Sequence, residues 1–197
     1  MWLYGFGKAA VGILYRMLWR VRTEGLENVP REGGVIIAGN HVNGNDPLFV
    51  GITAPRPVSF MAKEEIFGVP GVGFLARGVG AFPVKRGQPD RAALKRSLAV
   101  LEDGGCFGIF PEGTRNRTGK LGKAEPGTAY LALKSGAVVV PVGISSTYKL
   151  FSPVTLKYGK PVDLTPFMAG KLSSEVLDAA GEAIMAAIGA QLIPPAH

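Results

Sequence analysis

The chain has 197 residues, 47% of them hydrophobic, which fits one globular domain built around a single core. Cys106 is the only cysteine, which excludes an intrachain disulfide and favours a reducing compartment. The net charge of +7 favours a polyanionic partner: nucleic acid, acidic lipid or a phosphorylated substrate. The mean hydropathy of +0.21 predicts that some of the apolar surface faces something other than water.

Residues 1–22 are predicted to form an amphipathic helix that associates with a membrane surface. Apolar side chains share one arc of its helical wheel: Leu3, Phe6, Ala10, Ile13, Leu14, Met17 and Leu18. The opposite side carries Lys8, Tyr15 and Arg16. Trp2, Trp19 and Arg20 lie away from the middle of the arc, which suits rim aromatics and cations that meet acidic head groups. The alternative is a helix packed on its own domain. The early cations interrupt the ~20 apolar residues that a membrane-spanning helix requires.

The rest of the chain alternates between strands and helices. Apolar runs rich in β-branched or aromatic residues predict strands at 35–38, 58–61, 80–84, 107–110, 138–142 and 154–158. Capping residues and apolar periodicity predict helices at 46–53, 90–103, about 126–134 and about 173–192. This alternation predicts a single α/β domain over 23–192, with a central, largely parallel β-sheet flanked by helices, and a loose tail at 193–197.

Residues 67–75 form an irregular stretch that is rich in glycine and proline and yet apolar. Its composition predicts a loop that avoids water. One hypothesis is a buried connection between two elements of the domain. The other is a flap or groove wall that contacts an acyl chain or the bilayer, since buried loops leave backbone groups that are hard to satisfy.

The first group of residues suited to chemistry lies between the first predicted strand and the helix after it. His41 follows the strand, and Asp46 begins the helix after a turn that contains Gly44. Across such a turn the carboxylate can reach the imidazole, fix its tautomer and stabilise the imidazolium that forms when the other nitrogen accepts a proton. No serine lies between them, so the pair predicts direct activation of a substrate hydroxyl. The structural alternative for Asp46 is a helix cap.

Two further groups of candidate residues follow the carboxyl ends of predicted strands, where open α/β sheets bind their ligands. In the segment 110–115, Gly113 allows close backbone approach, Thr114 offers a hydroxyl and the Arg115 guanidinium suits a phosphate. Glu112 is predicted to accept from a substrate hydroxyl or to orient that arginine. The third group holds the adjacent cations Lys85 and Arg86. Surface solvation is the ordinary role of such a pair, but together with Arg115 it predicts a phosphate site.

These motifs resemble those of the 1-acylglycerol-3-phosphate acyltransferases, the PlsC-like lysophospholipid acyltransferase family. The family has four sequence blocks: an asparagine, then a histidine and an aspartate separated by four residues; a block ending in arginine; Glu-Gly-Thr-Arg; and a proline between aliphatic residues. In this chain the blocks match, in the same order, Asn40-His41 with Asp46, 80–86, 112–115 and 140–142. They span over half of the chain.

The resemblance implies a glycerol-phosphate acyltransferase-like fold and a reaction. A fatty acyl group passes from a thioester, acyl-CoA or acyl carrier protein, to the sn-2 hydroxyl of 1-acylglycerol 3-phosphate (lysophosphatidic acid), which gives phosphatidic acid for phospholipid biosynthesis. It implies that the first block, with His41 and Asp46, is catalytic. It also implies that Lys63 lies near the developing oxyanion. The second and third blocks are assigned to the glycerol phosphate: Lys85, Arg86, Glu112, Gly113, Thr114 and Arg115.

The resemblance implies that neither a metal nor a cofactor is needed, because the thioester supplies the driving force. The chain departs from the family at Asn43, where many members carry serine. It is also short before the first block, so attachment to an anionic membrane surface, expected at the cytoplasmic face of the cell membrane in peripheral or monotopic form, rests on the N-terminal helix or on the loop 67–75. Both alternatives stay open.

Three alternative functions are compatible with parts of the sequence. The same chemistry could use another acceptor, such as glycerol 3-phosphate or another lysolipid. A catalytically silent lipid-binding protein could use the basic residues and the amphipathic helix, although the paired His41 and Asp46 argue against it. Nucleic-acid binding is suggested only by the net charge of +7, and the cations are not clustered with stacking aromatics, so no nucleic-acid partner is expected.

Overall fold

The computed structural model describes residues 2–71, 73, 76, 81–84, 90–116 and 120–193. Its helices are α1 (Trp2–Leu18), α2 (Asp46–Thr53), α4 (Arg91–Glu102), α5 (Pro126–Ser135) and α6 (Ser174–Gly189). Its strands are β1 (Arg20–Glu24), β2 (Val35–Gly39), β3 (Val58–Lys63), β4 (Phe82–Val84), β5 (Cys106–Ile109), β6 (Val138–Ser146) and β7 (Pro153–Tyr158). Short 3-10 helices are η1 (Leu26–Asn28), η2 (Glu64–Gly68) and η3 (Thr165–Phe167). The predicted α/β class is confirmed.

Within the described residues the strands form one seven-stranded sheet in the order β1-β7-β6-β2-β5-β3-β4. Neighbouring strands from β6 to β4 are all parallel. Strand β7 runs antiparallel to β6, and the edge strand β1 runs parallel to β7, so these two strands point opposite to the rest. The central strand β2 is buried at every position, as expected for a parallel strand with helices over both faces. The predicted central, largely parallel sheet is confirmed.

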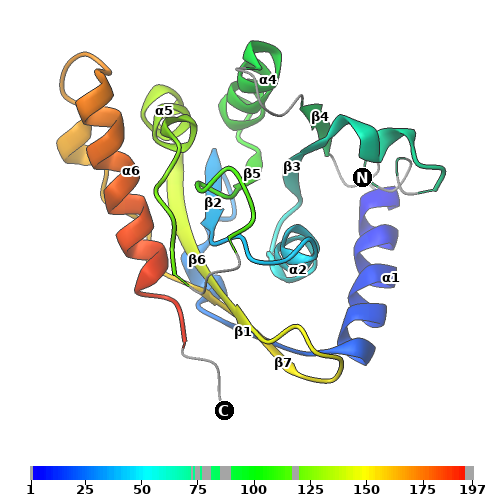
Figure 1. The fold of residues 1–197 in the computed structure, drawn as a ribbon. Helices are drawn as coiled ribbons and strands as arrows, with labels where there is room; N and C mark the ends of the chain where they lie inside the picture. The colour runs from blue at the N-terminus through cyan, green and yellow to red at the C-terminus, as the bar shows by residue number, and fades with distance from the viewer. Residues whose placement is uncertain are drawn as a thin grey trace.

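Helices cover both faces of the sheet (Figure 1). Alternate side chains of β2 serve two cores: Val35 and Ile37 point to one, and Ile36 and Ala38 point to the other. Helices α1 and α2 build the first core with a cluster of rings whose centroids lie 5.0 to 5.5 Å apart: Tyr15, Trp19 and Phe49. Helices α4, α5 and α6 build the second core from aliphatic side chains.

Helix α1 is shorter than the predicted helix 1–22. It ends at Leu18, and the next residues form β1 at the edge of the sheet, paired with β7. In β1 only Val21 is partly buried, so the strand lacks the alternation of apolar residues that would have predicted it. Trp19 is 9% exposed and packs on Phe49, so it is a core residue and not a rim aromatic. Helix α6 ends at Gly189, and of the predicted tail only Ile193 lies within the described residues.

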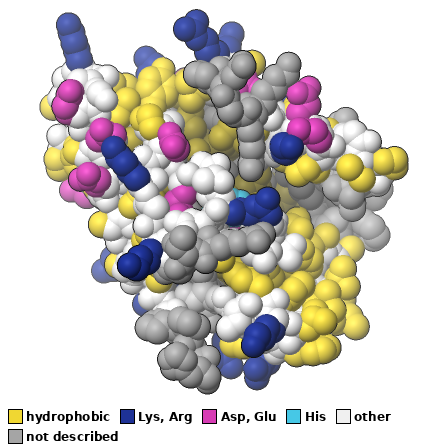
Figure 2. All heavy atoms as spheres, viewed as in Figure 1, with side chains coloured by type: hydrophobic (Ala, Val, Ile, Leu, Met, Phe, Trp, Pro, Cys, Tyr) yellow, Lys and Arg dark blue, Asp and Glu magenta, His cyan; other side chains and the backbone are white. Residues whose placement is uncertain are grey.

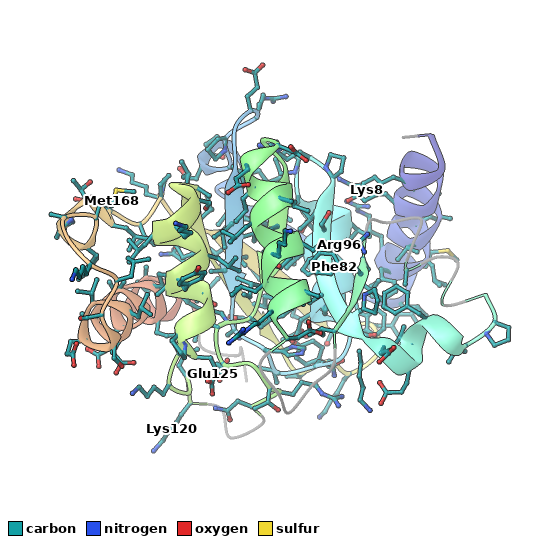
Figure 3. All side chains as sticks on the ribbon, turned by 90° about the horizontal axis from the view of Figure 1, so that it is seen from above. Lys8, Phe82, Arg96, Lys120, Glu125 and Met168 are labelled. Atoms are coloured by element: carbon teal, nitrogen blue, oxygen red, sulfur yellow. The ribbon has the colours of Figure 1, made fainter. Side chains whose placement is uncertain are left out.

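Three residues of the predicted apolar arc of α1 face away from the sheet, whereas Leu18, at the end of the helix, packs against the core. Ile13, Leu14 and Met17 are 64%, 52% and 69% exposed. The opposite side of the helix contacts the domain: Tyr15 is buried, and the Lys8 ammonium donates to the carbonyl oxygen of Ala54. Figure 3 shows Lys8 pointing from α1 toward the sheet. No helix in the described part of the chain has the length and apolar character needed to cross a bilayer.

The loop 67–75 is described only in part, because residues 72, 74 and 75 lie outside the described residues. Its first residues complete η2. Val69 is 49% exposed, and the neighbouring Ile66 is 38% exposed. The described part of this segment therefore exposes apolar side chains, which a wholly buried connection would not do.

Candidate active site

The candidate site begins where β2 ends, and Asn40 fixes this point. Its side-chain oxygen accepts from the N–H of Ile144 at 2.7 Å, and its side-chain nitrogen donates to the carbonyl oxygen of the same residue at 3.0 Å. The last backbone pair between β2 and β6 joins Gly39 to Val142. The buried Asn40 amide thus continues the pairing beyond the end of the strand and holds the start of the loop that carries His41.

His41 and Asp46 form the predicted pair. The Nδ1 atom of His41 lies 2.9 Å from Oδ2 of Asp46, and the two residues are 6% and 0% exposed. The same carboxylate oxygen accepts the backbone N–H groups of Val42 at 2.8 Å and Asn43 at 2.7 Å. Since Oδ2 is an acceptor, Nδ1 carries the proton in this contact, and Nε2 is left with its lone pair.

Asp46 is not the helix cap that its position suggested. Asn45 occupies the N-cap position of α2, without a side-chain cap, and Asp46 is the first helical residue. The Asn45 side chain instead accepts from the Tyr15 hydroxyl at 3.0 Å, which ties this turn to α1. The Asp46 carboxylate is therefore turned back toward the loop, where it serves the imidazole and two backbone N–H groups.

The ring of Phe110 lies flat against His41. The two ring centroids are 4.2 Å apart and the planes are inclined by 19°. Phe60 of β3 stacks on Phe110 in turn, with the two ring centroids 6.3 Å apart, so the three rings form a row. The imidazole plane is thus set by packing as well as by its hydrogen bond to Asp46.

The Glu112 carboxylate accepts from two backbone N–H groups of the site. It is 7% exposed; one carboxylate oxygen accepts from the N–H of His41 at 3.1 Å and the other from the N–H of Gly122 at 3.0 Å. The carbonyl oxygen of His41 accepts from the N–H of Asn116 at 2.7 Å. The segment that carries the Glu-Gly-Thr-Arg motif therefore holds both backbone groups of His41.

The remaining residues of that motif lie at the surface. Gly113 has a φ of 66°, a left-handed conformation that favours glycine, and Thr114 and Arg115 are exposed. A Cβ atom placed on Gly44 would lie 3.7 Å from an Arg115 guanidinium nitrogen, so this cation lies beside the turn between His41 and Asp46. Within the described ranges Arg115 has no carboxylate partner. In Figure 2 a small histidine surface (cyan) adjoins a cationic side chain (dark blue).

Of the other predicted cations, only Lys63 lies within the described residues, and its ion pair there is with Glu65. Lys63 is at the end of β3, where its ammonium lies 2.8 Å from a Glu65 carboxylate oxygen and both side chains are exposed. Lys85 and Arg86 lie outside the described residues. Val84, the last residue of β4, pairs with Lys63.

Tyr148 is a site residue that the sequence analysis missed. Its hydroxyl donates to Oδ1 of Asp46 at 2.5 Å, from the connection between β6 and β7. Burial, and then the charge of Asp46, raise the pKa of the Tyr148 hydroxyl far above its ordinary value, which keeps it a donor. The signal that could have found it is the position of Tyr148 just beyond the carboxyl end of β6, a strand parallel to β2.

No group of three or more His, Cys, Asp and Glu side chains that could hold a metal ion occurs in the described part of the chain. With a single general base, a carboxylate partner and a surface cation, the arrangement can remove a proton from a hydroxyl that is presented to Nε2 of His41. The nearby Arg115 can attract an anionic group on the same molecule.

Comparison with known proteins places this geometry in a family. The family model described as Acyltransferase matches residues 20–145, which include His41, Asp46 and Glu112 to Arg115. A 1-acyl-sn-glycerol-3-phosphate acyltransferase of Bacillus subtilis is 31% identical over 188 residues, with 92% of this chain and 93% of the relative covered.

Other relatives are longer than this chain. The enzyme of the same name from Borreliella burgdorferi is 34% identical, but the match covers 67% of this chain and 54% of the relative. For the chloroplastic LPAT1 of Arabidopsis thaliana, at 32% identity, these shares are 67% and 38%. The chain thus spans about half of the length of the Borreliella burgdorferi enzyme and less than half of the length of LPAT1.

A solved structure has a similar fold. The crystal structure of the 1-acyl-sn-glycerophosphate (LPA) acyltransferase PlsC from Thermotoga maritima superposes with a TM-score of 0.73 at 29% identity, over 96% of this chain and 76% of the other. Likeness in sequence and likeness in three-dimensional structure agree, and the chain belongs to the acyltransferase family that includes the PlsC-like 1-acyl-sn-glycerol-3-phosphate acyltransferases.

Proposed function

We propose that this chain transfers a fatty acyl group from an acyl thioester to the sn-2 hydroxyl of 1-acylglycerol 3-phosphate and so makes phosphatidic acid. The observation that carries the proposal is the buried contact of 2.9 Å between His41 and Asp46, which leaves Nε2 of the imidazole as a base. The names of the similar proteins supply the substrate class. The donor is an acyl-CoA or an acyl carrier protein.

The proposed reaction has no acyl-enzyme intermediate. His41 takes the proton of the acceptor hydroxyl at Nε2, and the resulting alkoxide oxygen attacks the thioester carbonyl carbon. The tetrahedral intermediate collapses with cleavage of the carbon–sulfur bond, and the thiolate takes the proton from the imidazolium. Asp46 stabilises that imidazolium through Nδ1. General-base catalysis of this kind contributes about 10²–10⁴ in rate.

Recognition of the acceptor is assigned to the cations near the base. The exposed Arg115 guanidinium, beside the turn at Gly44, is suited to the phosphate, and Lys85 and Arg86 are proposed to add to it. Gly113 and Thr114 adjoin Arg115 in the same turn. Lys63 is proposed to stabilise the oxyanion, which requires it to leave Glu65; an exposed ion pair of this kind is weak.

The proposed place of action is an anionic membrane surface at the cytoplasmic face of the cell membrane. The support is the exposed arc of α1, where Ile13, Leu14 and Met17 face away from the domain and Arg16 is exposed beside them. A helix with this distribution lies in the plane of the interface, with aliphatic side chains among the acyl chains and cations at the head groups.

The test is a matrix of donors and acceptors assayed in detergent micelles, with the lipid product identified by mass spectrometry. Wild type is expected to release thiol and form phosphatidic acid from 1-acylglycerol 3-phosphate. His41→Ala should abolish turnover while binding of the lysolipid survives. The control is Arg31→Ala, an exposed residue that precedes β2 at the opposite edge of the sheet. Full activity of His41→Ala would exclude the general-base role, and product with another acceptor alone would reassign the substrate.

A further inference from the structure

The connection between β6 and β7, residues 147–152, shows two large apolar side chains at its tip. Leu150 and Phe151 are 61% and 66% exposed. Phe151 has a φ of 62°, a left-handed backbone conformation that is rare and costly for a bulky residue. A strained backbone that turns a phenylalanine outward is unusual for a connection whose only role is to join two strands.

Hydrogen bonds hold this tip against the end of α1. The N–H of Phe151 donates to the carbonyl oxygen of Leu18 at 2.7 Å, and the Arg20 side chain donates to the carbonyl oxygen of Phe151 at 3.0 Å. The N–H of Arg20 also donates to the carbonyl oxygen of Ser152 at 3.1 Å. The tip and the helix are therefore one fixed surface, and Figure 2 shows a continuous apolar area (yellow) at the lower right, where Figure 1 places both.

The charges on this surface have one sign. Arg16, Arg20 and Lys149 are exposed around it, and neither α1 nor the segment 147–152 contains an aspartate or a glutamate. A second copy of the chain related by a two-fold axis would bring these cations against one another. An anionic bilayer satisfies both the apolar side chains and the cations.

We infer that Leu150 and Phe151 insert into an anionic lipid bilayer together with the exposed arc of α1, as a second membrane contact that fixes the orientation of the domain. This inference extends the membrane association in the proposed function, which assigned the contact to α1 alone. Two contacts held at a fixed distance orient a body on a surface, whereas one helix can roll about its own axis.

The test compares binding to sonicated vesicles of phosphatidylcholine with and without phosphatidylglycerol, by co-sedimentation. The variant Leu150→Ser/Phe151→Asn removes the apolar tip, and asparagine tolerates the left-handed backbone. The control Met168→Ser/Leu172→Ser removes two exposed apolar side chains, 51% and 36% exposed, before α6. Figure 3 shows Met168 on the side of the molecule opposite α1.

The tip variant is expected to bind anionic vesicles about tenfold more weakly than wild type, and the control variant to bind like wild type. Equal binding of tip variant and wild type overturns the inference. So does a tip variant that keeps vesicle binding but changes the mass measured by light scattering, since the surface would then join two copies. Turnover of a soluble short-chain lysolipid, measured in parallel, should be unchanged in the tip variant. If wild type itself shows no turnover, the proposed function is contradicted and the inference about the tip is not.

Tyr148, in the same connection, contacts the carboxylate of the catalytic pair. Its hydroxyl lies 2.5 Å from Oδ1 of Asp46, while Oδ2 faces His41 and the backbone. Its φ of 56° is again left-handed, and its N–H donates to the Ser146 hydroxyl at 2.9 Å. Its ring lies 6.4 Å from that of Phe49, between centroids. The connection thus holds a strained conformation that directs one hydroxyl to the carboxylate.

The geometry assigns Tyr148 as a positioning residue that acts through Asp46. With both oxygens engaged, the carboxylate cannot rotate away from Nδ1, so the imidazole keeps the orientation that its role as a base requires. The hydroxyl itself does not touch the imidazole or the acceptor in this role.

The test is Tyr148→Phe, which keeps the ring and removes only the hydroxyl. We expect kcat to fall about tenfold or more with both KM values unchanged, since only the base is misplaced. In a His197→Ala background, the single remaining histidine should also show a shifted Nδ1 proton resonance. The control is Tyr158→Phe, which removes another buried hydroxyl, one that lies 2.7 Å from the Thr53 hydroxyl. A kcat that falls no further than in this control, or an unshifted resonance, refutes the assignment.

Discussion

His41 is restrained at four points before any substrate arrives. Asp46 contacts Nδ1, Glu112 accepts its N–H, Asn116 donates to its carbonyl oxygen and the Phe110 ring stacks on its imidazole. A general base that is already oriented needs no reorganisation during the reaction. Of these contacts only the one with Asp46 is made to a ring nitrogen, so only it affects the proton affinity of the imidazole directly. The others fix the backbone and the ring plane.

The first prediction separates this support from substrate binding. Glu112→Gln leaves an acceptor for one of the two N–H groups, of His41 and Gly122, and deprives the other. We expect a loss of about 1–3 kcal/mol in the free energy of unfolding, because a buried donor is left unsatisfied. The KM for the phosphorylated acceptor should stay constant while kcat falls. Urea unfolding and steady-state kinetics measure these effects. A raised KM at constant kcat would contradict this prediction and would support a direct contact between Glu112 and the substrate.

The second prediction concerns Arg115, the cation beside Gly44. Arg115→Ala should raise the KM for 1-acylglycerol 3-phosphate about tenfold, because a charge-assisted hydrogen bond to phosphate is lost. A neutral monoacylglycerol should be used equally well by variant and wild type. Arg31→Ala controls for the loss of one positive charge. If the KM for the neutral acceptor rises as much as the KM for the phosphorylated one, Arg115 does not bind the phosphate.

At the scale of elements, β5 shows how packing reaches the base. A Cβ atom on Gly108 would lie 2.1 Å from a carbon of the Phe60 ring, so only glycine leaves room for this ring beside the strand. Phe60 stacks toward Phe110, and Phe110 stacks on His41. A glycine in the sheet thus determines how closely the row of rings can pack against the imidazole.

The third prediction follows from this row. Gly108→Ala should displace Phe60, destabilise the fold by about 1–3 kcal/mol through overpacking and lower kcat through Phe110. The matched control is Gly51→Ala in α2, where an added Cβ meets no atom within 4 Å. That variant should be stabilised by about 0.5–1 kcal/mol, since alanine suits a helix interior better than glycine. Thermal unfolding of both variants checks the opposite signs, and two equal shifts would contradict the packing argument.

The elements differ in how far the sequence predicts them. Strand β2 and the helix at Asp46 were predictable because apolar runs and capping patterns are local signals. The pairing of His41 with Asp46 was predictable for the same reason, since only a short turn separates them. Strand β1 was not, because its pairing with β7 provides its structure and its side chains are mostly exposed.

The contacts that the sequence did not predict join distant segments. Tyr148 is 102 residues from Asp46, and no local pattern marks the contact. Glu112 matched a motif, but its partners are backbone N–H groups, which a comparison of side-chain types does not reveal. Trp19 looked like a rim aromatic because a helical wheel cannot tell where the helix ends.

At the scale of the whole molecule, burial of weak acids makes the fold sensitive to alkali. Burial raises the pKa of the Cys106 thiol from 9.0 to about 12, and it raises the pKa of the Tyr148 and Tyr158 hydroxyls as well. In the unfolded chain these groups lose their protons at their ordinary pKa values. Above about pH 9 the unfolded state therefore binds fewer protons than the folded state, and stability falls as pH rises.

The fourth prediction is that the free energy of unfolding decreases steadily between pH 9 and 12. Cys106→Ala should remove the share of the slope due to the thiol, up to about 1.4 kcal/mol per pH unit. Urea unfolding at several pH values, for wild type and variant, gives both slopes. Identical slopes would mean that the thiol does not hold its proton in the folded state.

The reversed direction of β1 and β7 has a consequence for how a lipid substrate is presented. Because β7 runs antiparallel to β6, the amino ends of β7 and β1 lie at the same edge of the sheet as the carboxyl end of β2. The end of α1 and the tip at Leu150 therefore meet the edge that carries His41. On the proposed membrane surface, a lysolipid could offer its glycerol hydroxyl to the imidazole while its tail stays among the acyl chains. Full extraction of that tail into water would cost about 0.8 kcal/mol for each CH₂ group, and this geometry avoids it.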